Sequence, residues 1–520
     1  MITSPWDLQT ALSKTTLVRD TKTLCLRGGT YRGKFISSLN GGGIVRSAPG
    51  EWAIIDGNTF TTLVGAITSG QTSITLADGS KILNAGQTDE ISIDLEVIKF
   101  CRKSGNNLTS CGRNASGSVG GAVSHASGAT VHQAGNQLTT SGGNTVYRNF
   151  EITNSVTDRT ETALPEFSYG GGIFNTGTGN SFINLVIHDN GIGIFSGSST
   201  QNTLVYGCVI YNNGGLRVGN VPYGPALYLE NTAGYSRVHE TIALNSFKNS
   251  MQGFGVTGPY VGGDIQGSVF AGVGAPSGEI ARNLIYGPDS QVSPTAVVNE
   301  SHFYHPPGSS GYSVTFGYGA GIINGIFTNN YIGGGATAMS VENVTNLTFT
   351  GNKIFNVSVN VLSSQVPYTW NNNTYYNTAS TANKFGNTTL GGNQIFANWR
   401  GSTGFDTTSI NNSGNLPDAI IVRPNAYETG RANIIVYAAS NPSSININLS
   451  TTGLSNGQGY TVKNAFNWYG SSVATGTYNS GSPSISVPLS SVTSVATPTG
   501  RPSAPATTCP SLCLLVVVPN

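Results

Sequence analysis

Short runs of alternating apolar and polar residues repeat along residues 144–356, and each run ends near an Asn or a Gly. They include NTVYRNFEITNS (144–155), NSFINLVIHDNG (180–191), NTLVYGCVIYNNG (202–214) and NLTFTGNKIFNVS (346–358). Asn180 and Asn202 are 22 residues apart, and so are Asn324 and Asn346; elsewhere the spacing widens to 33 or 36. Alternation predicts strands, and a fixed period of this length predicts stacked coils with loops inserted between equivalent positions.

We therefore predict an all-β fold whose main body is a parallel β-helix, with neighbouring coils paired at the usual ~4.8 Å strand spacing. Asn at the turns suits the left-handed conformation and can also form amide ladders along the axis. A β-sandwich or a propeller is the alternative, but propeller blades repeat at ~40 residues or more. Three apolar residues of one coil are expected to point inward and stack on three of the next: Ile183, Val186 and Ile187 on Leu204, Val209 and Ile210.

The ends of a solenoid need covers, because the last coil would otherwise expose its core and its strand edges. The amphipathic segment WDLQTALSKTTLV predicts a short N-terminal helix that covers one end with Trp6, Leu8, Leu12 and Leu17. The Asn- and Thr-rich residues 360–415 are expected to form a last irregular coil and a linker.

Changes in pattern divide the chain into five regions. Short strands with tight turns interrupt the coils at 65–134, and strands separated by turns every ~8–12 residues follow the coils and predict a β-sandwich. The expected regions are a cap with the first coils (1–64), a small inserted all-β module (65–134), the main β-helix (135–415), a C-terminal β-sandwich (416–500), and a linker with a terminal strand (501–520).

Composition and charge exclude several classes of function. Charged residues make up only 9% of the 520 residues, and the net charge is +1, which argues against a nucleic-acid partner. The chain contains no run of 18 apolar residues, so the sequence predicts no membrane span. A surface of Asn, Ser and Thr is typical of secreted proteins, so we expect an extracellular location, although the first residues do not resemble a signal peptide.

The cysteines suggest one bridge and no metal site. Cys101 and Cys111 flank a predicted hairpin turn and are placed to pair, whereas Cys509 and Cys513 lack further Cys or His neighbours that would indicate zinc. Two further cysteines lie in apolar strand patterns and are expected to be buried, namely Cys25 and Cys208.

The segments LCLRGGTYRGKF and IVRSAPGEWAIIDG resemble the opening of secreted bacterial right-handed parallel β-helix proteins of the pectin-lyase-like superfamily. The resemblance continues through VIHDNGIGIF, CVIYNNG and RPNAYETGRANIIVYA, and thus covers most of the chain. It implies a right-handed coil and indicates little about activity, because the superfamily contains lyases, hydrolases, epimerases, phage tailspikes and many uncharacterised proteins. The inserted module resembles one found in phage tail and baseplate proteins, which suggests a carbohydrate or surface contact, or a decorative insertion. Where relatives carry G-H-G-I-Y, this chain reads YGPALY, with Pro225 and Ala226, so it lacks the His of that segment.

Candidate functional residues lie in the loops that stretch the period, because a β-helix carries function on one exposed face and its flanking loops. If the coils stack in register, groups from neighbouring coils converge within ~10 Å. The candidate catalytic residues are Asp158, Arg159, His188, Asp189, Arg217 and Glu230. The candidate substrate-binding residues are Tyr169, Tyr223, Tyr228 and Lys248, and the candidate metal ligands are Asp158, Glu161 and Asp189.

Two chemistries fit this cluster. A lyase acting on uronic acid polymers needs a cation at the carboxylate, Ca²⁺ or Arg, and a base that removes the C5 proton. A hydrolase needs two carboxylates ~5–10 Å apart, such as Asp158 with Asp189 or Asp189 with Glu230. Exposed tyrosines suit the apolar faces of sugar rings. Each residue also has a structural interpretation: Asp189 and His188 as turn residues, and Asp158–Arg159 as an ion pair.

The predicted function is therefore binding, with or without cleavage, of an extracellular polysaccharide, with Ca²⁺ as the only expected cofactor. The alternative is a non-catalytic surface or structural protein, such as an adhesin, a self-assembling filament subunit or a tail-fibre-like protein.

Overall fold

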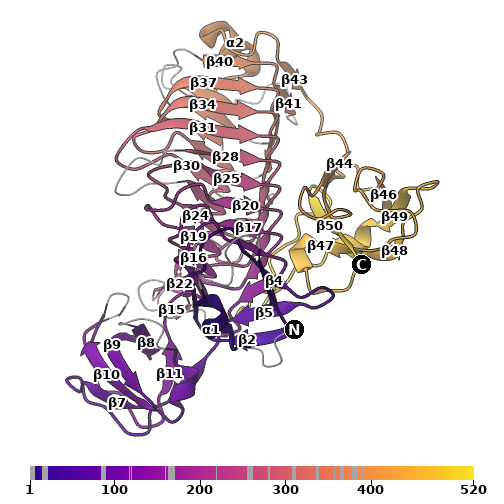
Figure 1. The fold of residues 1–520 in the computed structure, drawn as a ribbon. Helices are drawn as coiled ribbons and strands as arrows, with labels where there is room; N and C mark the ends of the chain where they lie inside the picture. Colours follow the sequence, from indigo (N-terminus) through magenta and orange to yellow (C-terminus); the bar gives the residue numbers. More distant parts are fainter. Residues whose placement is uncertain are drawn as a thin grey trace.

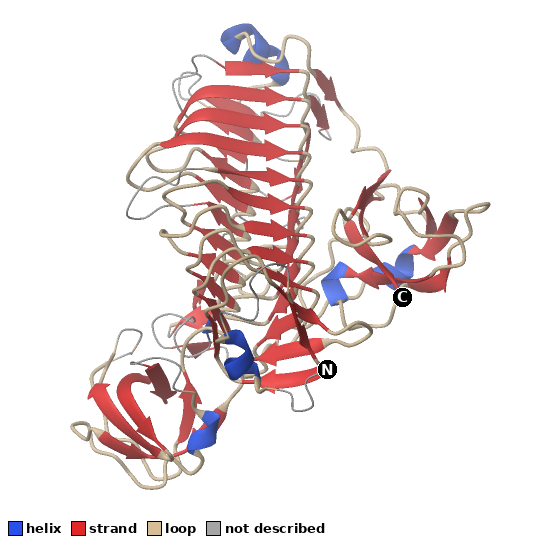
Figure 2. Cartoon of the chain, in the orientation of Figure 1, coloured by secondary structure: helices blue, strands red, loops and turns tan. Residues whose placement is uncertain are grey.

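The computed structural model describes residues 6–14, 22–83, 89–115, 118, 120–157, 160–161, 170–217, 219–253, 262–278, 281–306, 312–334, 339–356, 358–362, 368–376, 384–387 and 392–520. For residues 111, 160, 161 and 387 only the backbone is described. Figure 1 shows a long stack of coils with a small module at its N-terminal end and a second domain along one side. Figure 2 shows that nearly all regular structure is strand.

Three parallel sheets form the stack, and each coil passes through sheet A, then sheet B, then sheet C. In the described residues, sheet A contains β1 (Thr23–Leu26), β4 (Ile44–Ser47), β13 (Val146–Arg148), β17 (Ser181–Ile183), β20 (Leu204–Tyr206), β25 (Ser236–His239), β28 (Gly263–Gln266), β31 (Ser293–Asn299), β34 (Ile322–Thr328), β37 (Val344–Thr350) and β40 (Tyr368–Asn371).

Sheet B contains β2 (Gly29–Arg32), β5 (Ala53–Asp56), β14 (Glu151–Thr153), β18 (Val186–His188), β21 (Val209–Tyr211), β26 (Ile242–Leu244), β29 (Val269–Ala271), β32 (His302–His305), β35 (Tyr331–Gly334), β38 (Lys353–Phe355), β41 (Thr374–Tyr376) and β43 (Ile410–Asn412). Sheet C contains β3 (Phe35–Ser37), β12 (Leu138–Thr140), β16 (Ile173–Asn175), β19 (Ile194–Ser196), β24 (Leu227–Leu229), β27 (Met251–Gly253), β30 (Leu284–Tyr286), β33 (Val314–Phe316), β36 (Met339–Val341), β39 (Val359–Val361) and β42 (Phe385–Asn387). This topology confirms the predicted parallel β-helix.

The turn from sheet A to sheet B is short, and its first residue has a positive φ in coil after coil. Asn occupies this position at 149, 184, 329 and 372, with φ of 53–58°, and Gly occupies it at 207, 267 and 351. The second turn position carries buried amides: the Asn330 side chain donates to that of Asn352, and Asn352 donates to Asn373, both at 3.1 Å. The expected left-handed asparagines and amide ladder are therefore present.

The interior confirms part of the predicted stacking and corrects the rest. Ile187 lies over Ile210 inside the coil, in the main hydrophobic core. Val186 also pairs with Val209, but both point outward, because alternate strand residues face opposite sides of a sheet. Ile183 is opposite Tyr206, not Leu204 as we expected.

Both ends of the solenoid are covered. Helix α1 (Leu8–Leu12) packs Leu8 and Leu12 onto the first coil, as predicted, whereas Trp6 is 39% exposed and Leu17 lies outside the described residues. The opposite end carries α2 (Phe396–Thr403), which we did not predict. Its Trp399 is fully buried beside Trp370, so aromatic packing closes this end.

The inserted module leaves the coil between β5 of sheet B and β12 of sheet C. It is an antiparallel sheet of β6 (Phe60–Thr62), β11 (Thr130–Gln133), β8 (Asp89–Ile93), β9 (Glu96–Ser104), β10 (Asn107–Gly112) and β7 (Ser73–Thr75), with the 3-10 turn η1 (Gly79–Lys81). Because β6 already belongs to it, the module begins about five residues before our expected boundary at 65. A buried Glu96, held by Arg113 at 2.8 Å and His125 at 2.9 Å, fixes its interior. The expected Cys101–Cys111 bridge stays a prediction, because the side chain of Cys111 lies outside the described part of the structure.

The C-terminal domain is a sandwich of two antiparallel sheets around its own core. One sheet contains β44 (Ala419–Pro424), β45 (Ala432–Tyr437), β50 (Cys513–Pro519), β47 (Gly459–Asn464) and β48 (Ala474–Thr477), and the other contains β46 (Ser444–Asn448) and β49 (Ser484–Pro488). The turns η3 (Ala465–Asn467) and η4 (Leu489–Val492) complete it. Because β50 is the central strand of the larger sheet, the terminal strand that we set apart belongs to this domain.

The cysteines differ in part from expectation. Cys208 is buried, as predicted, but Cys25 is exposed, because its side chain lies on the outward side of β1. Cys509 and Cys513 form a disulfide at the start of β50, a role that their spacing had not indicated.

The larger sheet of this sandwich is packed against the outer face of sheet B (Figure 1). Val186, Val209, Ile242 and Val269 of the coils share one hydrophobic cluster with Ile435, Tyr437, Leu514 and Val516 of the domain. Polar contacts flank the cluster: Arg423 binds Glu240 at 2.7 Å and Glu300 at 3.1 Å. One lateral face of the β-helix is therefore occupied by its own C-terminal domain.

Candidate functional site

His188 and Asp189, two of the predicted catalytic residues, lie inside this interface. His188 donates from Nδ1 to Asp189 at 2.7 Å and from Nε2 to Glu151 at 2.9 Å. Its ring is parallel to that of Tyr211, with centroids 4.7 Å apart, and Tyr469 of the C-terminal domain packs nearby at 5.6 Å. The imidazole is therefore enclosed by coil and domain instead of facing an open groove.

The electrostatics of this cluster favour a charged imidazolium. Burial by itself lowers the pKa of His188, but the hydrogen bonds and charges of Asp189 and Glu151 outweigh it and raise the pKa to about 9. Glu151 also accepts from the Trp52 indole at 3.1 Å and from the Tyr469 hydroxyl. The Thr499 backbone N–H donates to Asp189 at 2.7 Å. These contacts correct our placement: His188 and Asp189 join two domains.

Several predicted residues lie outside the described part of the chain. Asp158, Arg159 and Tyr169 are not described, and Glu161 is described only as backbone, in β15 (Thr160–Glu161). Among the described residues, no group of three His, Cys, Asp or Glu side chains could hold a metal ion. Both oxygens of Asp189 accept hydrogen bonds, one from His188 and one from the Thr499 N–H, and its role as a calcium ligand stays a prediction.

The outward face of sheet C carries a row of aromatic rings in its N-terminal half. Phe174, Phe195 and Tyr228 occupy equivalent positions on β16, β19 and β24, and all three are half-buried. Their rings stack, with centroids 5.2 Å and 5.0 Å apart. We call these three residues the aromatic ladder. The next residue along this row is Gln252, so the aromatic ladder ends at Tyr228.

Tyr228 brings the aromatic ladder next to a carboxylate. Its hydroxyl donates to Glu230, at the end of the same strand. Burial raises the pKa of Glu230, and the hydrogen bond from Tyr228 offsets only part of that effect. Glu230, which we predicted as catalytic, is therefore a carboxyl group that holds a proton more readily than an exposed one.

A β-hairpin lies beside this face, where the chain passes from sheet B to sheet C. It consists of β22 (Gly215–Arg217) and β23 (Val221–Tyr223), and β15 adds a third strand, with Glu161 opposite Arg217. The Arg217 guanidinium lies over the Tyr223 ring at 4.2 Å, a cation–π contact. Burial raises the pKa of Tyr228, and Tyr223 is near enough to contribute to that shift. Arg217, Tyr223, Tyr228 and Glu230 thus lie near one another, but all four come from one segment, and the predicted convergence with groups of neighbouring coils stays a prediction.

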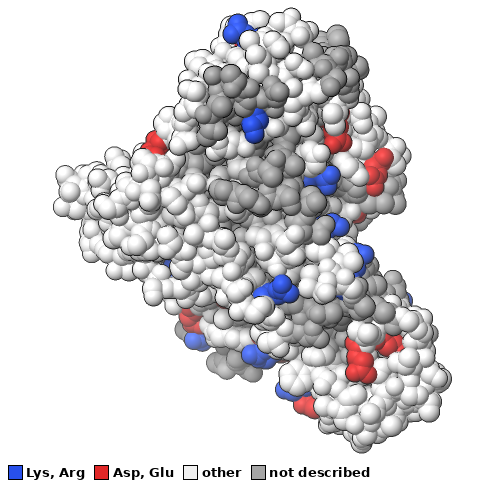
Figure 3. Space-filling view, turned by 180° about the vertical axis from the view of Figure 1, so that it is seen from behind, with Lys and Arg blue, Asp and Glu red and all other residues white. Residues whose placement is uncertain are grey.

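Charges of opposite sign follow the two long edges of sheet C. The strands begin at one edge, next to the hairpin, and end at the other. Cations precede the strands at Arg217, Lys248 and Arg282, and carboxylates follow them at Glu230, Asp289 and Glu342. Predicted Lys248 thus lies at the same edge as the hairpin, because Phe247 pairs with Asn213 of the coil below. Figure 3 shows that most of the described surface on the back of the molecule is uncharged, with scattered Lys, Arg, Asp and Glu.

Sequence reasoning missed Phe174 and Phe195, although a signal exists. Each Phe is the last residue of a Gly-Ile-Phe tripeptide, in GGIFNTG and in GIGIFSG. The two are 21 residues apart, which is almost the repeat length. The aromatic ladder becomes visible when positions are aligned coil by coil.

None of the helices described is long and apolar enough to cross a bilayer. No protein-family model matches the chain, and no curated protein matches it in sequence.

Solved structures with low identity match most of the chain. They include pectate lyase Pel9A (12% identity, 81% of this chain and 84% of that chain, TM-score 0.36) and PfbA, a surface adhesin of Streptococcus pneumoniae (10%, 83% and 93%, 0.34). The gp54 tailspike of Acinetobacter baumannii bacteriophage AP22, solved with an A. baumannii capsular saccharide, matches with 12% identity, 96% and 88% coverage, and a TM-score of 0.20. By its own strand topology, the protein is a parallel β-helix with an inserted antiparallel module and a docked C-terminal sandwich.

Proposed function

We propose that this protein binds an extracellular polysaccharide along the outward face of sheet C. The observation that carries the proposal is the aromatic ladder, which ends at Tyr228 beside Glu230. Sheet B cannot serve, because the C-terminal domain covers much of its outer face.

The residues around the aromatic ladder supply the contacts that a sugar chain uses. Aromatic rings pack against the C–H groups of pyranose rings, and carboxylates accept hydrogen bonds from hydroxyls. Coils repeat every ~4.8 Å along the face, so one chain lying parallel to the axis meets equivalent positions repeatedly. Arg217 and Lys248 at one edge favour a polymer that carries carboxylates.

Binding is tested with the purified full chain on pectate, alginate, hyaluronan and neutral polysaccharides, by affinity electrophoresis and calorimetry. Tyr228→Ala should weaken binding of the preferred polymer at least tenfold, because it removes a ring and a partner of Glu230. The matched control is Asn346→Ala, an exposed change on sheet A, which should bind as the wild type does. Equal binding by both variants, or no binding to any polymer, would contradict the proposal.

Cleavage is a second candidate, and the raised pKa of Glu230 favours it, because a carboxyl group that keeps its proton can donate it to a glycosidic oxygen. Reducing ends and absorbance near 235 nm would be recorded with Ca²⁺ and with a chelator. Glu230→Gln should abolish product formation and keep binding. Binding without products from the wild type would establish a non-catalytic surface protein, and light scattering would then test for self-assembly.

A further inference from the structure

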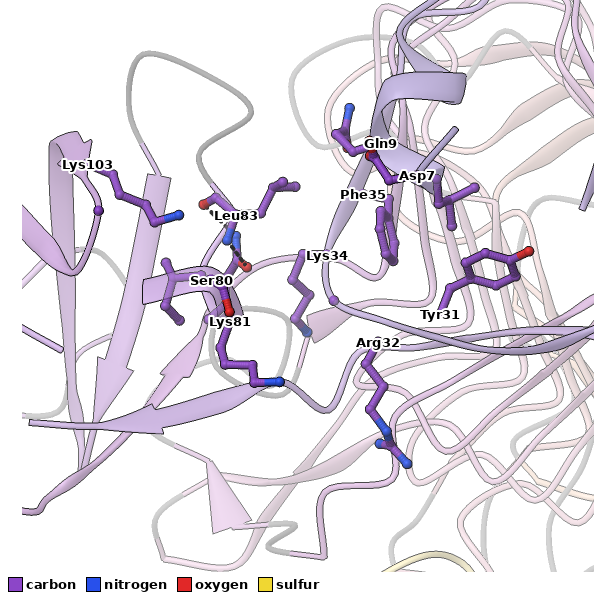
Figure 4. Close-up of a pocket in the computed structure, with 15 residues that line it drawn as sticks. Asp7, Gln9, Tyr31, Arg32, Lys34, Phe35, Ser80, Lys81, Leu83 and Lys103 are labelled. Carbon is purple, nitrogen blue, oxygen red and sulfur yellow. Dashed lines mark hydrogen bonds between the residues drawn. The ribbon is translucent and has the colours of Figure 1, made fainter. Parts of the chain in front are cut away.

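The junction between the inserted module and the first coil contains a cavity of about 610 Å³. Strand residues Tyr31 to Phe35 form one wall, and residues 80–83 with Lys103 form the other. Figure 4 shows Lys81 extending from the module toward Arg32 of the coil. A second cavity of about 590 Å³ shares Arg32, Ser80 and Lys81 with the first and adds Phe60. We call the two cavities together the junction pocket.

The walls of the junction pocket are held in place by hydrogen bonds. On the coil side, the Gln9 side chain of α1 donates to the Ile36 carbonyl at 2.8 Å and accepts from its N–H at 2.9 Å. On the module side, Gln133 holds Leu83 in the same way, at 3.1 Å and 2.9 Å. A ligand would therefore meet a formed site and would not have to order it first.

Cations dominate the described lining. Arg32, Lys34, Lys81 and Lys103 line the first cavity together with one carboxylate, that of Asp7, which accepts from the N–H and the hydroxyl of Thr10. Only 9% of the residues in the chain are charged, so four cations around one cavity are a high local concentration.

The four cations differ in how far they are already used. Lys34 is buried and donates to Gln137 at 2.6 Å, and Arg32 binds Asp56 at 2.6 Å. The ammonium groups of Lys81 and Lys103 make no hydrogen bond or ion pair with the described residues, although both act electrostatically on the nearby Asp78. Lys81 and Lys103 are thus the cations available to a ligand.

Aromatic rings complete the junction pocket. Tyr31 and Phe35 line the first cavity, and Phe60, which is 53% exposed, lines the second. Cations next to exposed rings suit a ligand that combines a carboxylate with the apolar face of a sugar.

We infer that the junction pocket is a second binding site, which takes carboxylate-bearing sugars of an acidic polysaccharide. Lys81 and Lys103 pair with the carboxylate, and Phe60 and Tyr31 contact the sugar ring. The saccharide nature of the ligand rests on the proposed function, whereas the requirement for an anion rests on the junction pocket alone. The inserted module and the first coil then hold the polymer between them, near the N-terminal end of the β-helix.

The test uses calorimetry on the full chain with a short oligogalacturonate, its methyl ester and inorganic phosphate. The wild type should bind the acid form and lose at least tenfold in affinity for the uncharged ester. A Lys81→Ala, Lys103→Ala double variant should lose at least tenfold in affinity for the acid form at this site and show a weaker dependence on salt. The matched control is Lys99→Ala, an exposed lysine on the same strand as Lys103 but outside the junction pocket, which should bind as the wild type does.

Tyr228→Ala separates the two proposals, because it alters sheet C and leaves the junction pocket intact. Loss of binding in Tyr228→Ala, with no effect of the double lysine change, would overturn the second site and keep the proposed function. The reverse pattern would overturn the proposed face and keep the second site. Phosphate that binds as tightly as the sugar acid would show a general anion site and would contradict this inference.

Discussion

At the scale of single residues, the environment of a side chain decides its role more than its chemical type. His188 has the reactive group that a polysaccharide lyase could use as a base, but Glu151 and Asp189 hold its ring from both nitrogens. Glu240 and Glu300 give a second example. They occupy the left-handed turn position at φ 50°, where other coils have Asn or Gly. A Glu there is unfavourable, yet both carboxylates reach Arg423 of the docked domain.

The stability of the protein should depend on the charge of His188. Its pKa in the folded state, about 9, lies above the unfolded value of about 6.5. The stabilisation is therefore complete below pH ~6.5 and is lost as the pH rises through 9, by an amount on the order of 3 kcal/mol. Denaturation at pH 6 to 9.5 should show this decline in the wild type, and His188→Gln should flatten it.

His239→Gln is the matched control, because that imidazole contacts Asp264 on sheet A, at 2.7 Å, in a pair that is partly exposed. It should leave the decline unchanged, since a partly exposed pair of this kind contributes little. Parallel curves for the wild type and His188→Gln would show that the interface does not hold a charged imidazole.

At the scale of elements, each coil is stabilised by the coils next to it. Ile187 and Ile210 stack inside, and the buried amides of Asn330, Asn352 and Asn373 connect successive turns. Asn352 also donates to the Phe327 carbonyl at 3.0 Å and accepts from the Asn330 N–H at 2.9 Å. Removing one amide therefore leaves backbone groups of two coils without partners in a site that excludes water.

Asn352→Ala should lower the free energy of unfolding by about 2–4 kcal/mol, because it leaves buried polar groups unsatisfied. The control is Asn346→Ala, which removes an exposed amide contact to Asn324 at 3.0 Å and should cost less than about 0.5 kcal/mol. Chemical denaturation of the two variants checks the difference. Similar losses would mean that the buried ladder contributes no more than a surface contact.

At the scale of the whole molecule, two hydrophobic surfaces meet where the C-terminal domain docks. β45 is buried on both sides: Ile434 and Val436 face the sandwich core, whereas Ile435 and Tyr437 face sheet B. The central strand β50 has the same arrangement, with Leu514 and Val516 toward the coils. Such strands lack polar alternation because neither face meets water.

Val209→Asp should separate the domain from the coils without unfolding them, because Val209 is fully buried but points outward into the interface. Thermal unfolding should then split into two transitions, and protease should cut within residues 404–418. Ile210→Asp, one residue further, places the charge inside the coil and should prevent folding. A single unchanged transition in Val209→Asp would contradict the assigned interface.

The coil architecture was accessible from the sequence because its contacts are local. The 22-residue spacing, the Asn and Gly turns and the Leu8–Leu12 cap all follow from neighbouring coils, and the structure contains them. The candidate site was predicted only in part. Tyr223, Tyr228 and Glu230 lie together, whereas His188 and Asp189 were expected on an exposed face that the C-terminal domain covers.

The sequence by itself therefore determined the repeating unit, because alternation, turn residues and period are properties of a few dozen consecutive residues. Only the tertiary structure decided which face of the coil remains open. That choice depends on contacts such as Asp189 with Thr499, which are 310 residues apart and leave no periodic trace. Their one local sign is the loss of alternation in NIIVY and CLLVVV, which shows that both faces are covered and not what covers them.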